Sequence, residues 1–259
     1  MNLQLEGISA LVTGSTAGIG LAIAQTLAAE GAAVTIVGRT QAKVDAALAE
    51  IEGPVNGLVA DLGQASGAAA VLEQLPSVDV LVNNLGVYEA KPFSDIADAD
   101  WLRIFEVNVM SGVRLSRAYL PGMLDRNWGR ILFISSESGV QTPPEMIHYG
   151  MTKSAQLAVS RGLAETTKGT GVTVNSVLPG PTRSEGIVDF LRSMSTNPDA
   201  TDAEVESEFF AKHRPASLLQ RLIEAREVAT TVAYLASPLS SATNGAAIKV
   251  EGGLLRSIV

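Results

Sequence analysis

The chain has 259 residues, of which 46% are hydrophobic, and its formal net charge at neutral pH is −8. This composition supports a large buried core and excludes an intrinsically disordered chain. The negative charge argues against a nucleic-acid partner, because binding of phosphates needs a basic surface. Cysteine is absent and only two histidines are present, His148 and His213. The sequence therefore excludes disulfides, thiolate nucleophiles and cysteine-based zinc sites, and we expect no metal.

Neither a membrane anchor nor a secretion signal is visible. No apolar run approaches the ~20 residues of a membrane-spanning helix. The N-terminal residues 1–14 have no basic stretch leading into an apolar segment. These features predict a soluble, cytoplasmic protein with no membrane partner.

Short apolar runs rich in β-branched residues alternate along the chain with alanine- and leucine-rich segments of helical spacing. The apolar runs contain few polar residues, which is typical of strands buried on both faces. They cover residues 8–13, 33–37, 55–60, 78–83, 130–135, 172–178 and 246–250. The helical segments cover residues 18–31, 40–51, 63–75, 101–124, 149–169 and 224–237, and the segment 101–124 is long enough for two helices. This alternation predicts one α/β domain over residues 1–259, with a parallel sheet and helices on both faces.

One segment, residues 181–223, departs from this alternation. It is polar, carries charges of both signs and shows only weak helical runs. A segment of this length inside a domain is usually functional, most often as a lid over an active site. A disordered surface insertion is the alternative, but the apolar clusters at 187–191 and 209–210 favour the lid.

The stretch "TGSTAGIG" at 13–20 lies between the first predicted strand and the first predicted helix. Its glycines, Gly14, Gly18 and Gly20, permit a tight turn and close approach of the backbone to a diphosphate, and the helix N-terminus offers free N–H donors. Glycine-rich turns also occur at helix starts for capping alone. The strand before and the long helix after favour a dinucleotide-binding turn here.

Ligands of such sheets bind beyond the carboxyl ends of the strands, so the residues that follow each strand are candidates. After the second strand, Gly38 replaces the acidic residue that would bind the ribose of NAD, and Arg39 suits the 2′-phosphate of NADP. After the third strand, Asp61 can accept from an adenine amino group or act as a helix N-cap. After the fourth strand, "NNLG" at 83–86 can bridge backbone and ligand or simply form a turn.

Tyr149 and Lys153 are four residues apart, so on a helix they share a face with Cβ atoms ~5–6 Å apart. An ammonium near a phenol favours the phenolate and lowers its pKa from ~10. Such a phenol suits protonation of the alkoxide that hydride addition to a carbonyl leaves. Ser136, at the end of the strand 130–135, can donate to the same oxygen. In isolation, the same pair also occurs on solvated helix faces.

The motifs "TGSTAGIG", "DL", "NNLG", "ISSESG", "YGMTK" and "PGPT" occur in this order and at suitable spacing. The chain thereby resembles the short-chain dehydrogenase/reductase family, in the group that includes the 3-oxoacyl-carrier-protein reductases, from Leu5 to the "EGG" at 251–253. The resemblance implies a doubly wound Rossmann-type domain with a seven-stranded parallel sheet. It also implies hydride transfer between a nicotinamide and a carbonyl or alcohol, such as a 3-oxoacyl compound or other small ketone, and a homo-oligomer, either a tetramer or a dimer.

The resemblance also implies the site residues. Ser136, Tyr149 and Lys153 match the catalytic serine, tyrosine and lysine, Lys153 also binds the nicotinamide ribose, and Asn108 supports a water-linked proton relay. The expected cofactor contacts are Gly14, Ser15, Thr16, Gly18, Ile19, Gly20, Arg39, Asp61, Leu62, Asn84, Gly86, Tyr149, Lys153, Pro179, Gly180 and Thr182. The expected substrate contacts are Ser138 and His148, and a purely structural role for His148 is an equal alternative.

Three positions depart from the family pattern. Leu85 replaces the alanine of the usual N-N-A-G, Ala17 replaces a basic residue common in NADP-dependent members, and Glu251 replaces the aspartate of the usual D-G-G. Because Gly38 and Arg39 suit a 2′-phosphate, the cofactor is expected to be NADP(H), with NAD(H) as the alternative. The leading function is an oxidoreductase, and the alternative function is a non-catalytic NAD(P)-binding regulator or scaffold.

Overall fold

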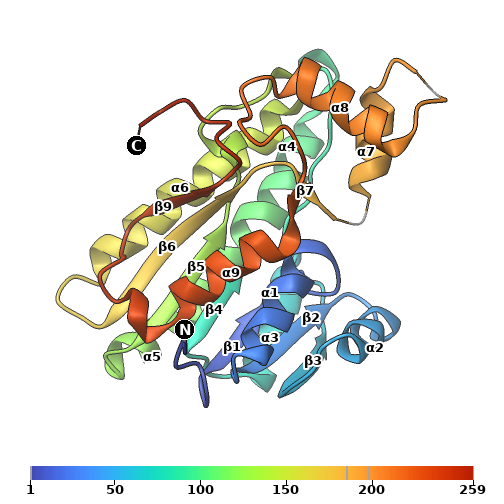
Figure 1. Ribbon diagram of the computed structural model, residues 1–259. Helices are drawn as coiled ribbons and strands as arrows, with labels where there is room; N and C mark the ends of the chain where they lie inside the picture. Colours follow the sequence, from blue (N-terminus) through green and yellow to red (C-terminus); the bar gives the residue numbers. More distant parts are fainter. Residues whose placement is uncertain (1, 185, 198, 259) are drawn as a thin grey trace.

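Seven parallel strands run through the centre of the molecule (Figure 1), in the order β3-β2-β1-β4-β5-β6-β9. The computed structural model describes residues 2–184, 186–197 and 199–258. The strands of this sheet are β1 (Ser9–Val12), β2 (Ala33–Gly38), β3 (Val55–Val59), β4 (Val80–Asn83), β5 (Gly129–Ile134), β6 (Val172–Pro179) and β9 (Ala247–Val250). The predicted doubly wound, seven-stranded parallel sheet is confirmed.

Helices cover both faces of the sheet (Figure 1). One face is covered by α1 (Gly18–Ala29), α2 (Gln41–Ala49) and α9 (Ala225–Ala236), and the other by α3 (Ala65–Gln74), α5 (Ser111–Asp125) and α6 (Ile147–Thr166). In every strand of the sheet except β9, alternate side chains enter the two resulting hydrophobic clusters, as the period of two in a strand requires. In β1, Ala10 and Val12 enter the first cluster and Leu11 enters the second. None of the helices in the described part of the chain could cross a membrane.

The segment predicted as one or two helices at 101–124 contains a π-helical turn. Here α4 (Asp98–Phe105) continues into a π turn at Glu106–Met110 and then into α5. Such turns often occur at functional sites, because the extra residue changes the direction in which side chains project. Asn108 lies in the middle of this turn and is buried.

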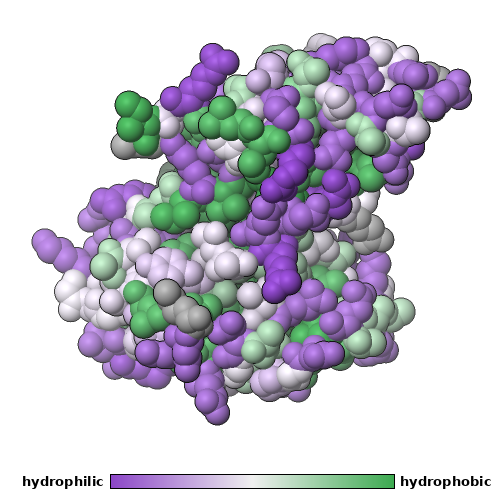
Figure 2. All heavy atoms as spheres, in the orientation of Figure 1, coloured by the Kyte–Doolittle hydropathy of each residue, from purple (hydrophilic) through white to green (hydrophobic). Residues whose placement is uncertain are grey.

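The polar segment at 181–223 folds into two helices, α7 (Ile187–Met194) and α8 (Asp202–His213), where the sequence shows only weak helical runs. Its two ends pair with each other as the short parallel strands β7 (Thr182–Arg183) and β8 (Ile223–Glu224). The apolar residues of the segment form a cluster of their own, made of Ile187, Leu191, Ala200, Val205, Phe209, Phe210 and Leu222. Its outer surface, at the upper right of Figure 2, is mainly hydrophilic. We call this segment the insertion.

The turn between β1 and α1 is held against the end of β4. The Asn84 side-chain amide donates to the carbonyl oxygens of Thr13, at 2.9 Å, and Gly14, at 3.0 Å. Gly20 lies directly against this contact. A Cβ at Gly20 would be 2.3 Å from the Gly14 carbonyl oxygen and 2.4 Å from Asn84 Nδ2. The close approach of helix and turn therefore requires glycine at this position.

We expect Gly20→Ala to lower the free energy of unfolding by about 1–3 kcal/mol, because the added methyl would separate α1 from the turn. Gly162→Ala is the control. Gly162 lies within α6, and a Cβ there would meet no atom within 4 Å, so alanine should raise the free energy of unfolding by about 0.5–1 kcal/mol. Urea unfolding followed by circular dichroism measures both values, and equal stabilities for the two variants would contradict the packing described.

Candidate active site

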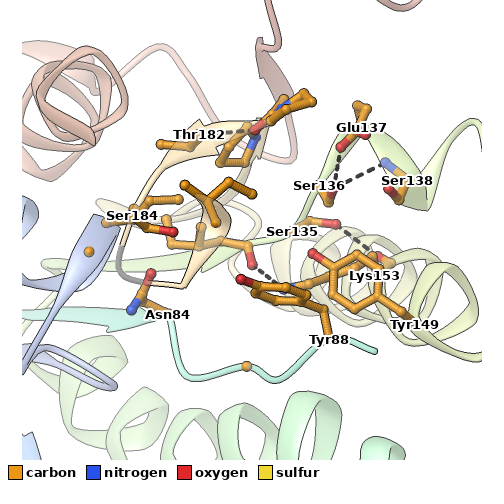
Figure 3. A pocket seen from close by; sticks show the side chains of 18 of the residues that line it. Asn84, Tyr88, Ser135, Ser136, Glu137, Ser138, Tyr149, Lys153, Thr182 and Ser184 are labelled. Carbon is orange, nitrogen blue, oxygen red and sulfur yellow. Dashed lines mark hydrogen bonds between the residues drawn. The ribbon is translucent and has the colours of Figure 1, made fainter. Parts of the chain in front are cut away.

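A cavity of about 320 Å³ lies at the carboxyl ends of the strands, between the β1–α1 turn and the insertion (Figure 3). This is the edge of a parallel sheet at which ligands bind. Several elements that are distant in sequence contribute to its wall: the turn, the ends of β5 and β6, α6 and the insertion. Of the predicted site residues, those that line it are Gly14, Gly18, Ile19, Gly20, Asn84, Gly86, Ser136, Ser138, Tyr149, Lys153, Pro179, Gly180 and Thr182.

Ser136 and Tyr149 face the same part of this cavity (Figure 3). Ser136 is the second residue after β5, whereas Tyr149 and Lys153 lie one turn apart on α6. In Figure 3 the Ser136 side chain lies between the Glu137 carboxylate and the Tyr149 ring. The Ser136 hydroxyl donates to Glu137 and accepts from the Ser138 N–H at 3.1 Å. The hydroxyls of Ser136 and Tyr149 thus border the same space, so both could donate hydrogen bonds to one oxygen atom of a ligand in the cavity.

Helix α6 crosses the end of β5 in close contact. The Ser135 hydroxyl donates to the Lys153 carbonyl oxygen at 2.9 Å, and Lys153 Nζ donates to the Ile134 carbonyl oxygen at 2.8 Å. A Cβ at Gly139 would lie 2.8 Å from the Lys153 carbonyl carbon. Only glycine permits this approach, which fixes Lys153 relative to Ser136.

The pKa of Tyr149 differs from the sequence prediction. Lys153 is expected to lower it, but desolvation raises the pKa of Tyr149, the Glu137 carboxylate raises it further, and only the Ser136 hydroxyl acts in the opposite direction. Lys153 is itself buried, and its Nζ donates to the Ile134 carbonyl and lies 5.6 Å from the centre of the tyrosine ring. Desolvation lowers the pKa of Lys153 to about 7, against the opposing effect of Glu137.

Asn108 is not among the described residues that line the cavity. Its Oδ1 accepts from the Val87 N–H at 2.8 Å, and its Nδ2 donates to the Val87 carbonyl at 2.9 Å and to Thr152 Oγ1 at 3.0 Å. Its backbone carbonyl accepts from Gln156 Nε2 at 2.6 Å, and Gln156 Oε1 accepts from Lys153 Nζ at 3.2 Å. A glutamine side chain therefore links the lysine to the Asn108 carbonyl, where the family resemblance implies a link through water.

The glycine turn fits the diphosphate of a dinucleotide. Gly14 and Gly18 have φ values of +60° and +55°, in the left-handed region that favours glycine. Helix α1 begins at Gly18, its N-cap residue Ala17 makes no side-chain hydrogen bond, and its first residues line the cavity. A Cβ on Gly14 would lie 3.0 Å from Leu85 Cα, and one on Gly18 would lie 3.1 Å from Ser184 Cβ. Uncapped N–H groups at the positive end of a helix, next to glycines that allow close approach of the backbone, suit an anionic diphosphate.

Five predicted cofactor residues lie outside the cavity lining. The Ser15 hydroxyl bonds to backbone groups of β1 and β2, and the Leu62 side chain is buried in the core, so only their backbones could reach a ligand. Thr16 packs against the end of β2. Asp61 accepts from the N–H two residues ahead at 3.1 Å, and α3 has its own N-cap further along, so the N-cap interpretation is wrong. Arg39 is exposed beyond the end of β2.

The structure places His148 away from the cavity, contrary to its predicted contact with substrate. Its side chain is 0% exposed, and its ring packs edge-on against Trp101 at a centroid distance of 5.9 Å. Neither ring nitrogen has a hydrogen-bond partner among the described residues, and desolvation lowers the pKa of the ring. The neutral ring is thus part of the packing between α4 and α6.

Sequence reasoning missed several residues of the cavity wall. Glu137 lies beside the predicted serine, Arg214 reaches the cavity from beyond α8, and the Tyr88 ring packs edge-on against Tyr149 at 6.3 Å. One signal was available for the cavity wall, because Glu137 directly follows the predicted serine. Gln156, which bonds to Lys153 but does not line the cavity, lies one helical turn after the predicted lysine. The sequence did not indicate Arg214 as a site residue, because the insertion contains no recognisable motif.

Residues 9–193 match the family model for short chain dehydrogenases. The chain therefore belongs to the short-chain dehydrogenase/reductase family, whose members are NAD(P)-dependent oxidoreductases. It is 48% identical to the uncharacterized oxidoreductase YvaG of Bacillus subtilis (strain 168), over 100% of each chain. It is 32% identical to the 3-oxoacyl-[acyl-carrier-protein] reductase FabG of Escherichia coli (strain K12), over 97% of this chain and 99% of that protein. The structure of L-sorbose reductase from Gluconobacter frateurii, complexed with NADPH and L-sorbose, is similar over 100% of both chains, with a TM-score of 0.91 and 27% identity.

The buried lysine makes stability depend on pH. Between pH 7 and 10.5 the unfolded chain holds a proton on Lys153 that the folded chain lacks, so the free energy of unfolding rises with pH over this window. We expect Lys153→Met to remove this rise and to stabilise the fold near pH 7.5 by about 1–3 kcal/mol. Urea unfolding at several pH values measures the difference, with the exposed Lys168→Met as control. Parallel pH profiles for Lys153→Met and the parent would contradict the assignment.

Proposed function

We propose that the chain transfers a hydride between NADP(H) and a carbonyl compound or secondary alcohol, with Tyr149 as general acid and base. The observation that carries this proposal is that Ser136, Tyr149 and Lys153 meet in one cavity whose other end is the uncapped glycine turn. A bound nicotinamide would supply the hydride in reduction and accept it in oxidation. The presence of all three side chains argues against a non-catalytic regulator or scaffold.

The roles of the side chains follow from their protonation. Because desolvation raises the pKa of Tyr149, the phenol is protonated at neutral pH and can donate to the oxygen of a carbonyl in the cavity. The Ser136 hydroxyl would hold the same oxygen. Lys153, with a pKa of about 7, is charged in part of the molecules at neutral pH, and its charged form would stabilise the phenolate that remains. Oxidation of an alcohol uses the same groups in reverse.

The residues after β2 support a preference for NADP(H). The position that would bind the ribose of NAD is Gly38, where a Cβ would lie 2.6 Å from Thr16 Cγ2, so an acidic side chain there would require Thr16 to shift. Arg39 follows it, is exposed, and forms no ion pair within the described part of the chain. Its planar guanidinium can hold a 2′-phosphate through two hydrogen bonds. Lys43, one turn further along α2, adds a weaker attraction.

The insertion is proposed to act as a lid over the substrate. Ile187, Phe190 and Phe209 line the cavity from the insertion, and the Phe190 ring packs edge-on against Tyr88 at 5.6 Å. These apolar side chains would exclude water from the reacting groups, which strengthens every electrostatic interaction inside. The insertion is also tied to itself through β7 and β8, so it can move as one unit.

We expect Tyr149→Phe to lower the turnover number with NADPH and a reducible ketone by about 10²–10⁴-fold, because the ring remains and the proton is lost. Binding of NADPH, measured by its fluorescence, should stay within a few-fold of the parent. Tyr234→Phe is the matched control, because Tyr234 is an exposed tyrosine on α9 that does not line the cavity. A Tyr149→Phe protein that turns over at nearly the parent rate would refute the mechanism.

We expect Arg39→Ala to lower the ratio of NADPH affinity to NADH affinity by about 10- to 100-fold, the effect of one hydrogen-bonded contact to a charged group. Dissociation constants of both reduced cofactors give the ratio for parent and variant. Arg226→Ala removes the same charge from the exposed face of α9 and should leave the ratio unchanged. An unaltered ratio in Arg39→Ala, or equal affinities in the parent, would exclude Arg39 as the discriminating residue.

A further inference from the structure

A buried carboxylate with unused hydrogen-bonding capacity lies beside the proposed proton donor. The Glu137 side chain is 5% exposed and lines the cavity. One of its oxygens accepts from the Ser136 hydroxyl, and the other lies 3.6 Å from Arg214 Nε. In the described part of the chain no further group donates to this carboxylate. Since an ionised carboxylate offers about four acceptor positions, Glu137 can accept from a ligand.

Arg214 does not neutralise this carboxylate alone. Its Nη1 pairs with Glu145 at 3.1 Å and donates to the His213 carbonyl at 2.9 Å, and its guanidinium packs over the Phe209 ring at 5.4 Å. One cation is therefore shared by Glu137 and Glu145, and its position is fixed from several sides. The group of three charges keeps a net negative charge, which favours hydrogen-bond donors over anions as ligands.

The Ser136 hydroxyl can donate only one hydrogen bond, and in this structure it donates that bond to the Glu137 carboxylate. If that hydroxyl turns to a substrate oxygen beside Tyr149, the carboxylate loses its only hydrogen-bond donor among the described residues and keeps only the ion pair with Arg214, at 3.6 Å. Removing a hydrogen bond from a buried charged group is unfavourable. A substrate that brings a donor of its own to Glu137, as it accepts a hydrogen bond from Ser136, avoids this cost.

We propose that Glu137 binds a substrate hydroxyl on the carbon next to the reacting carbonyl, so that the substrate class is the uncharged hydroxy ketones, including ketoses. This inference rests on the function proposed above. The substrate hydroxyl takes the place of Ser136 as donor to the carboxylate. The hydroxyls of Ser136 and Tyr149 are then both free to donate to the carbonyl oxygen.

Other classes of carbonyl compound offer no suitable hydrogen-bond donor to Glu137. A 3-oxoacyl thioester carries CH₂ groups on both sides of its ketone, so it would leave Glu137 facing apolar atoms. A keto acid would bring a second negative charge against the carboxylate. A hydroxy ketone has a donor on one side, and its C–H groups can face the apolar rings of Tyr88 and Phe190 on the opposite wall.

Hydroxyacetone and butanone test this inference, because they have the same number of heavy atoms and differ by a hydroxyl in place of a methyl. The ratio of their kcat/KM values with NADPH is measured in the parent and in variants, so that a general loss of rate cancels. We expect Glu137→Ala to lower the ratio about 10- to 100-fold and Glu137→Gln to lower it less, because the amide oxygen still accepts. Glu73→Ala is the control, because it removes a carboxylate from the exposed face of α3, away from the cavity and from Arg214, and it should leave the ratio unchanged.

A ratio that stays within about three-fold in both Glu137 variants would overturn the inference, and so would an equal fall in Glu73→Ala. A parent that reduces neither ketone would instead contradict the proposed function. Binding then decides the inference: saturation-transfer NMR on the Tyr149→Phe protein with NADPH detects bound hydroxyacetone without turnover. If a second substitution, Glu137→Ala, in the Tyr149→Phe protein abolishes that signal, the role of Glu137 is supported. An unchanged signal excludes it.

Discussion

The crossing of α6 over the end of β5 is the contact on which the site depends. Two hydrogen bonds, from the Ser135 hydroxyl to the Lys153 carbonyl and from Lys153 Nζ to the Ile134 carbonyl, join a helix to a strand edge. The lysine is thereby anchored at both its backbone and its ammonium. Because Tyr149 lies one turn earlier on the same helix and Ser136 follows the same strand, this single crossing sets the positions of both proposed donors.

The positions of the proposed catalytic residues could be predicted from sequence, but their environment could not. The spacing of Ser136, Tyr149 and Lys153 fixes them on one strand end and one helix face, and local periodicity is sufficient for that. The raised pKa of Tyr149 depends instead on desolvation by segments that are distant in sequence. His148 failed as a substrate contact because adjacent residues on a helix project about 100° apart, so it turns into the core when Tyr149 faces the cavity.

Burial of charge shapes the energetics of the site. Lys153 and Glu137 are both nearly inaccessible to water, and both would be better solvated in the unfolded chain. The fold tolerates them because each has partners: carbonyl and amide oxygens for the lysine, and a hydroxyl and a guanidinium for the glutamate. Glu137 also acts on the pKa values of Tyr149 and Lys153 together. A change in its hydrogen bonding therefore alters both groups at once.

The pairing of β7 with β8 brings the two ends of the insertion together: Thr182 lies opposite Ile223, and Arg183 opposite Glu224. The chain thus leaves the sheet region and returns to it at nearly the same point. The entropy of closing such a loop rises only with the logarithm of its length, so the insertion can be lengthened, shortened or exchanged with little effect on the sheet. The part of the cavity wall that the insertion supplies can therefore change in evolution, while the glycine turn and the β5–α6 crossing stay constant.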